Sequence, residues 1–267
     1  MSALGVAAAV GLDAVSYIFA ALGILWWRTG RPPTSSNPPE RVLSAVVSGL
    51  RFARYSSSAR ATLWRAVAFL FFASAYWALL PLVAKDLLHG GPELYGMLLT
   101  LLGVGAVSAA FILPYLTRLG ADKMVALGTA GTALGQFGFA FGGGKATGLF
   151  AAYIAGVSWV LVLSNLNVSM QLALPDWMRA RGMALFQMVF FGSMTLGSIL
   201  WGQLGSSFGL TASLTSSSVG ALVGILVTYR HRLNLGEMED HEPSRHWAEP
   251  NLQGGQFDNS NPEVILV

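Results

Sequence analysis

The chain has no cysteine and very little charge. None of its 267 residues is cysteine and only 11% are charged, whereas about a quarter of the residues of a soluble domain are charged. The absence of cysteine excludes disulfides, thiolate metal sites and cysteine nucleophiles. The low charge, together with 54% hydrophobic residues and a mean hydropathy of +0.56, predicts that most of the chain contacts lipid rather than water.

Catalytic and metal-binding motifs are also missing from the sequence. The 4 histidines fall in predicted loops or in the tail, and His241 and His246 have neither HExxH spacing nor thiolate partners. Lys145 follows three glycines but not in the GxxxxGK[ST] frame of a phosphate loop. We therefore predict no enzyme activity, no catalytic residue, no metal and no cofactor. The net charge is only +3 and the basic residues form no single face, so we predict no nucleic-acid partner.

What the sequence has instead is a series of long apolar runs separated by short polar turns. A run of about 20 apolar residues crosses the ~30 Å hydrocarbon core of a bilayer as a helix. The runs predict an all-α integral membrane protein, a polytopic bundle of about seven transmembrane helices whose partner is the lipid bilayer. The predicted spans are residues 2–27, 63–83, 94–117, 124–142, 147–171, 182–205 and 208–229.

Composition divides the chain into four parts. Residues 1–28 hold the first predicted span. Residues 29–62 begin rich in Pro and Ser and then read as a basic amphipathic helix from Glu40, which we expect at the cytoplasmic membrane surface. Residues 63–230 hold a six-helix bundle. Residues 231–267 are polar, and we expect a soluble, disordered tail whose last residues, PEVILV, look like the opening of a strand that the chain does not complete.

The positions of the basic residues predict the topology. If residues 28–62 are cytoplasmic, 14 of the 16 Lys and Arg lie on cytoplasmic segments, as the positive-inside rule requires. This places the C-terminus in the cytoplasm and, with an odd number of spans, the N-terminus outside. Because no signal pattern precedes the first span, we expect further sequence upstream.

Three stretches resemble one transporter family. Residues 171–205, QLALPDWMRARGMALFQMVFFGSMTLGSILWGQLG, resemble the tenth-to-eleventh-helix region of the major facilitator superfamily, in the bacterial branch of transmembrane secretion effectors or enterobactin-exporter-like proteins. RAVAFLFFASAYWALLPLVAKD and LYGMLLTLLGVGA are similar to the seventh and eighth helices. The loop motif of the family is degenerate here, with Pro114 at its first glycine position and Arg118 at its aspartate position.

The resemblance implies a function. It covers about helices six to twelve, the C-terminal half, so the implied partner is the missing N-terminal six-helix half. SRHWAEP also resembles the linker before a small C-terminal domain of this branch, which implies that the tail at 231–267 contains the start of a truncated small domain. The expected activity is proton-coupled secondary export of an amphipathic small molecule, such as a siderophore or a drug, across a bacterial cytoplasmic membrane. Two alternatives stay open: a half-transporter that acts only by pairing with another subunit, and a non-functional remnant.

Polar and aromatic side chains inside the spans are the candidate substrate contacts. The resemblance implies that spans 63–83 and 147–171 line the cavity, and polar groups within a bilayer are costly enough to indicate function. The alternative is that the Asn and Ser groups only hold helices together, each contributing about 1 kcal/mol or less to helix association. Ser158, Asn165 and Ser169 share one stripe of the predicted span 147–171. The candidates are Ser74, Tyr76, Trp77, Trp159, Asn165 and Asn167.

Charged residues in or near the spans have separate predicted roles. Asp13 is the acid well inside a span and is the candidate for proton coupling; alternatively, Ser16 and Tyr17, on the same helical face, satisfy its carboxylate. The arginines near the cytoplasmic surface serve as a gate, pairing with acids of the other half, or as topology anchors. These are Arg65, Arg118, Arg179 and Arg181.

Overall fold

The computed structural model describes residues 3–27, 50–51, 54–175 and 178–229, with side chains from residue 11 onward. Every regular element among these residues is a helix, which confirms the predicted all-α class. The amphipathic helix predicted from Glu40 lies mostly outside the described residues, and the tail at 231–267 lies entirely outside them.

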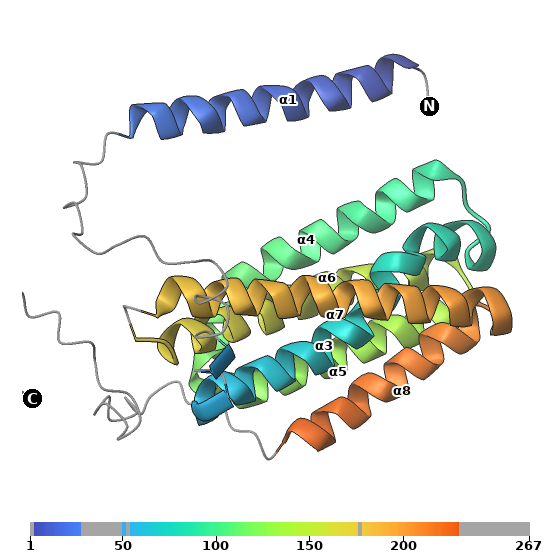
Figure 1. Ribbon diagram of the computed structural model, residues 1–267. Helices are drawn as coiled ribbons and strands as arrows, with labels where there is room; N and C mark the ends of the chain where they lie inside the picture. The colour runs from blue at the N-terminus through green and yellow to red at the C-terminus, as the bar shows by residue number, and fades with distance from the viewer. Residues whose placement is uncertain (1–2, 28–49, 52–53, 176–177, 230–267) are drawn as a thin grey trace, which may run out of the picture.

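Six of the described helices are long and apolar enough to cross a membrane. They follow one another with short connections, so successive helices run in opposite directions and form one bundle (Figure 1). The predicted polytopic helix bundle is therefore confirmed. The six helices are α3 (Ser57–Leu82), α4 (Pro92–Leu116), α5 (Ala121–Phe141), α6 (Lys145–Leu172), α7 (Arg179–Phe208) and α8 (Leu210–Thr228).

The predicted first span corresponds to α1 (Ala3–Trp26). In Figure 1 this helix lies apart from the six-helix bundle. Its side chains from Gly11 to Trp27 are all exposed, and they include large apolar groups such as Phe19 and Trp26. The described bundle thus buries its core without α1.

The bundle is built from two sets of close contacts. Helix α6 packs along both α4 and α5, and α3 packs along α7 and α8, while α5 also contacts α8. The α4–α6 crossing depends on Gly156, because a Cβ at this position would overlap the carbonyl oxygen of Leu102. On the α5 side, Gly131 leaves room for the Ser158 hydroxyl. Small residues allow such close approach in lipid, where dispersion forces drive helix association.

A helical turn that follows α3 continues past the end of the predicted span 63–83, and α3 itself begins before that span. It begins at Ser57 because the Ser56 side chain caps it, accepting a hydrogen bond from the Ala59 N–H at 3.2 Å. After Pro81 the chain continues as a π-helical turn, η1 (Val83–Leu87), in which the Leu88 N–H reaches back to the Val83 carbonyl at 3.0 Å. Residues that read as a loop therefore remain helical.

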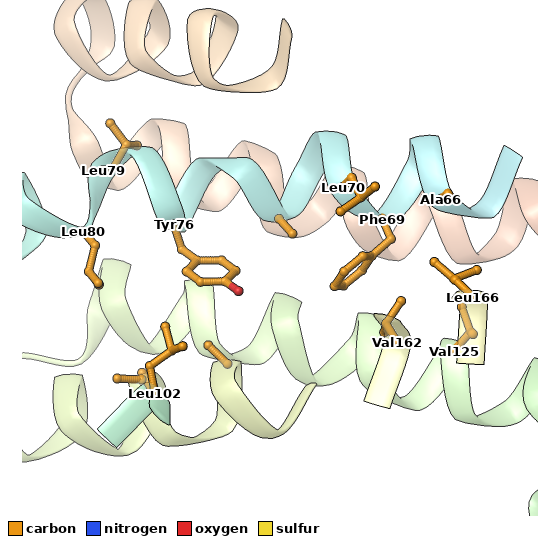
Figure 2. Close-up of a cluster of buried hydrophobic side chains, with 14 of the residues drawn as sticks. Ala66, Phe69, Leu70, Tyr76, Leu79, Leu80, Leu102, Val125, Val162 and Leu166 are labelled. Carbon is orange, nitrogen blue, oxygen red and sulfur yellow. The ribbon is translucent and has the colours of Figure 1, made fainter. Parts of the chain in front are cut away.

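Much of the core lies between α3 on one side and α4, α5 and α6 on the other. Figure 2 shows Phe69, Tyr76 and Leu80 of α3 facing the neighbouring helices, with Leu102 and Val162 opposite. Phe69 and Tyr76 are buried and seven residues apart, two helical turns on one face. This face positions the site described next.

Candidate functional site

Five aromatic side chains meet where α3, α6 and α7 come together, and we call them the Trp159 cluster. The Trp159 ring of α6 lies 5.4 Å from the Trp77 ring and 5.8 Å from the Phe69 ring, between centroids. Phe190 of α7 lies 6.2 Å from Trp159 on another side. Tyr76 completes the cluster, 5.6 Å from Trp77 and 6.4 Å from Trp159. Such tilted and edge-to-face geometries are the favoured ones for aromatic pairs.

Two polar atoms of this cluster have no hydrogen-bond partner among the described residues. The Tyr76 hydroxyl and the Trp77 indole N–H are both buried. The two groups are neighbours, but their geometry does not meet that of a hydrogen bond. A buried polar group without a partner costs about 1–3 kcal/mol, and each such group in a folded protein needs an explanation. A ligand with a donor or acceptor is one explanation.

The cluster continues onto a partly buried face of α6. Trp159 and Trp77 are only partly buried, whereas Tyr76 beneath them is fully buried. Leu163 and Asn167 follow Trp159 at four-residue intervals and are also partly buried. The Asn167 amide donates to the Leu163 carbonyl at 2.9 Å, so its amide group is held along this face. Three of the six candidate cavity residues, Tyr76, Trp77 and Trp159, thus meet in one cluster, and Asn167 lies on the same face of α6 about two helical turns away.

The other two candidates have a different environment. Ser74 is buried at the α3–α7 crossing, where its hydroxyl donates to the Phe71 carbonyl at 2.7 Å and lies against Gly197. Asn165 is 8% exposed, and its amide donates to the Leu161 carbonyl at 2.7 Å. It shares its stripe with Ser158, which lies against α5. Both hydrogen bonds stay within one helix, so Ser74 and Asn165 are satisfied locally, and only the packing of Ser74 against Gly197 joins two helices.

Asp13 is not brought near the Trp159 cluster. Its side chain is exposed on α1. Ser16, a predicted partner of its carboxylate, instead donates to the Asp13 backbone carbonyl at 2.7 Å. Proton coupling through Asp13 stays a prediction.

The four candidate arginines gather at one end of the bundle, because α3, α5 and α7 begin there and α4 and α6 end there. Arg65 is 5% exposed and its guanidinium forms an ion pair with Asp122 of α5 at 2.8 Å, so it pairs within this bundle. Arg118 and Arg179 are exposed. Arg181 is half-buried in the first turn of α7 and its guanidinium lies 3.7 Å from the Met178 sulfur. Their roles as gate or anchors stay predictions.

Sequence reasoning missed part of the aromatic architecture. Phe69 was not among the candidates, although its spacing from Tyr76 places both on one face of α3. A second group was also missed, which we call the Trp201 cluster: Trp201 of α7 with Phe71 and Phe72 of α3, each 5.8 Å away between ring centroids. The Trp201 indole N–H donates to the Phe71 carbonyl at 2.8 Å. No local signal in the sequence pairs residues 130 positions apart.

The part of the chain that the structure describes contains no group of three or more side chains able to hold a metal ion. The Trp159 cluster contains no charged side chain. Its chemistry is therefore that of an apolar, aromatic surface with a few hydrogen-bonding atoms.

Two comparisons with known proteins bear on this site. A family model described as transmembrane secretion effector matches residues 1–267, the whole of the chain. A search of the curated proteins finds no match.

Proposed function

The chain belongs to the transmembrane secretion effector family, an MFS-type transporter family, and on that premise we propose that it is a secondary active exporter of an amphipathic small molecule such as a siderophore or a drug. Family membership itself indicates a transporter rather than an enzyme. The observation that carries the finer proposal is the Trp159 cluster, with its aromatic faces and its two buried, unpartnered polar atoms.

The composition of the cluster supports a particular class of ligand. Aromatic faces attract apolar and cationic groups, and the cluster has no basic side chain that would select an anion. The Tyr76 hydroxyl and Trp77 N–H are buried in this structure, and a ligand that displaces the side chains covering them gains one or two directed hydrogen bonds. The ligand is therefore a neutral or cationic amphipathic molecule with at least one polar atom.

Export also needs a second bundle. Facilitators move substrate by rocking two bundles about a site near the bilayer midplane, and the described helices supply one bundle. Helix α7 is largely exposed, and a Cβ added at Gly192 of α7 or Gly103 of α4 would meet nothing within 4 Å. These open faces support docking of a second six-helix bundle, on the same polypeptide or on another chain.

Orientation and energy source complete the proposal. One end of the bundle carries Arg65, Arg118, Lys123 and both α7 arginines, and by the positive-inside rule this end is cytoplasmic. The same rule puts the C-terminus on the cytoplasmic side of a bacterial inner membrane. Protons supply the energy, with Asp13 as the carboxylate that carries them.

Transport of dyes by bacterial cells tests the proposal. Cells that express the full chain, alone or with a second six-helix bundle of the same family, are loaded with ethidium or Nile red, and the loss of fluorescence is followed. We expect efflux that a protonophore abolishes and that Trp159→Ala slows at least tenfold. The matched control is Trp64→Ala, which removes a 55% exposed tryptophan of the same helix that carries Trp77.

Two results would contradict the proposal. One is efflux that survives the protonophore, which removes the proton gradient as the energy source. The other is equal loss of efflux in Trp159→Ala and Trp64→Ala at equal amounts of folded protein, which removes the Trp159 cluster as the site.

A further inference from the structure

A separate pocket lies at the basic end of the bundle, between α3, α5 and α8. Its volume is about 240 Å³, which is below the range of about 300–1,000 Å³ for small-molecule sites. It borders the Trp159 cluster only through Phe69, which lines the pocket and lies 5.8 Å from Trp159 between ring centroids. The pocket therefore lies toward the basic end of the bundle and shares only Phe69 with the Trp159 cluster.

The pocket has a polar rim and an apolar wall. Asp122 and Lys123, in the first turn of α5, form the rim together with Arg65 of α3. The wall follows α5 as far as Thr129, which at about 1.5 Å per residue makes the pocket about 10 Å deep. The apolar wall residues are Phe69, Val125, Ala126, Ala221, Gly224 and Ile225.

The rim carries a net positive charge. Arg65 and Asp122 neutralise each other in their ion pair at 2.8 Å, and the exposed Lys123 leaves one positive charge in excess. Moreover, the Arg65 Nε–H is buried and has no acceptor among the described residues. The rim therefore favours a ligand that brings negative charge and acceptor oxygens, although Asp122 opposes any anion placed directly beside it.

We propose that this pocket binds the phosphodiester headgroup of an anionic membrane lipid, with the first carbons of an acyl chain along the α5–α8 wall. A pocket with a basic rim between transmembrane helices, at the level of the membrane surface, is where anionic headgroups are held. The apolar wall distinguishes a lipid from free phosphate, because free phosphate would leave that wall without a partner. Tyr229, 72% exposed at the same rim, supplies an aromatic ring and a hydroxyl at the interface.

Native mass spectrometry of the full chain in detergent tests the lipid site. The probe is dioleoylphosphatidylglycerol, with dioleoylphosphatidylcholine as the uncharged-headgroup comparison. We expect Lys123→Gln to lower the affinity for phosphatidylglycerol about fivefold, the fold-change that corresponds to about 1 kcal/mol for one basic residue at an anionic surface. The matched control is Lys145→Gln, because Lys145 is also exposed but begins α6 at the opposite end.

A second variant tests the wall separately from the charge. Ala126→Leu adds bulk to the α5 wall without changing the charge, and it should also weaken phosphatidylglycerol binding severalfold. Inorganic phosphate at millimolar concentration should not displace the lipid.

Circular dichroism checks that both variants fold like the wild type. The site would be overturned if Lys123→Gln and Ala126→Leu then bound phosphatidylglycerol with wild-type affinity. Displacement of the lipid by inorganic phosphate would overturn the lipid assignment and make the rim a general anion site. Dye efflux is not the readout here, so this proposal and the exporter proposal can fail independently.

Discussion

The two tryptophan clusters of α3 have similar aromatic content but differ in how their polar atoms are satisfied. In the Trp201 cluster the indole N–H donates to the Phe71 carbonyl at 2.8 Å, and the Trp201 carbonyl accepts from the Ser213 hydroxyl at 2.8 Å. In the Trp159 cluster the Trp77 N–H and the Tyr76 hydroxyl have no partner among the described residues.

On the proposed function, the difference separates a structural cluster from a ligand-binding one. Trp201 is only 4% exposed and its polar groups are used within the bundle, so its aromatic surface and hydrogen bonds stabilise the packing of α3, α7 and α8. Trp77 and Trp159 are partly exposed, and the unpaired atoms beside them give no stability to the bundle alone. Unmet polar groups are costly in a bilayer, and the proposed ligand would supply their partners.

The largest effect should come from Trp201→Ala. Removal of a large buried aromatic side chain costs about 3–5 kcal/mol, and this variant also leaves the Phe71 carbonyl without one of its donors. We expect a large fall in thermal stability, measured by size-exclusion chromatography after heating in detergent. A stability within 1 kcal/mol of wild type would remove the structural role.

The next effect should come from Trp159→Ala, on ligand binding rather than on stability. Because Trp159 is partly exposed and contacts Trp77, Phe69 and Phe190, its loss should lower ethidium affinity about tenfold, equivalent to about 1.4 kcal/mol. Fluorescence titration of the purified chain measures it. A stability loss as large as that of Trp201→Ala, with no change in affinity, would assign the cluster to packing.

A smaller effect should follow from Ser217→Ala. The Ser217 hydroxyl of α8 donates to the Phe72 carbonyl at 2.7 Å, and interhelical hydrogen bonds in membranes are worth about 0.6 kcal/mol on average. We expect a slight loss of thermal stability and unchanged dye affinity. Altered dye affinity at unchanged stability would mean that the Trp201 side of α3 also contacts ligand.

The smallest effect on stability should come from Tyr76→Phe. This change removes an unpartnered buried hydroxyl, so it should leave stability unchanged or raise it by up to about 1 kcal/mol. The affinity for a dye that uses the hydroxyl should fall severalfold. A clear loss of stability would show that the hydroxyl has a partner within the bundle, which contradicts the proposed contrast between the clusters.

Hydropathy predicted the number and approximate positions of the bundle helices but not the residues at which they begin and end. The predicted span 63–83 became α3 with its π-helical extension, Ser57 to Leu87, because hydropathy does not detect a serine cap or a polar first turn. Arg179 and Arg181, which precede the predicted span 182–205, lie in the first turn of α7 for the same reason. Asp176 and Trp177, in the polar turn before them, lie outside the described residues.

The site could be predicted only in part, because helices that are apolar all round carry little information on which face meets which neighbour. Tyr76, Trp77 and Trp159 were found from residue type, and the structure brings them together. Ser74 was chosen on the same ground, but it faces α7, where Gly197 leaves space for it. The orientation of Ser74 toward α7 therefore depends on Gly197, which is more than a hundred positions away in the sequence.

Fluorotryptophan NMR of the purified full chain tests the difference between the clusters most directly. Single Trp→Phe variants assign the signals of Trp77, Trp159 and Trp201 among the 8 tryptophans, and the wild-type protein is then titrated with ethidium, Nile red and an anionic dye, anilinonaphthalene sulfonate. We predict that the Trp77 and Trp159 signals shift to saturation with ethidium or Nile red while the Trp201 signal does not move. Two results would contradict the assignment of the Trp159 cluster as the ligand site. One is a saturable shift of the Trp201 signal while the Trp77 and Trp159 signals stay unchanged. The other is the absence of a saturable Trp159 shift with any of the three dyes.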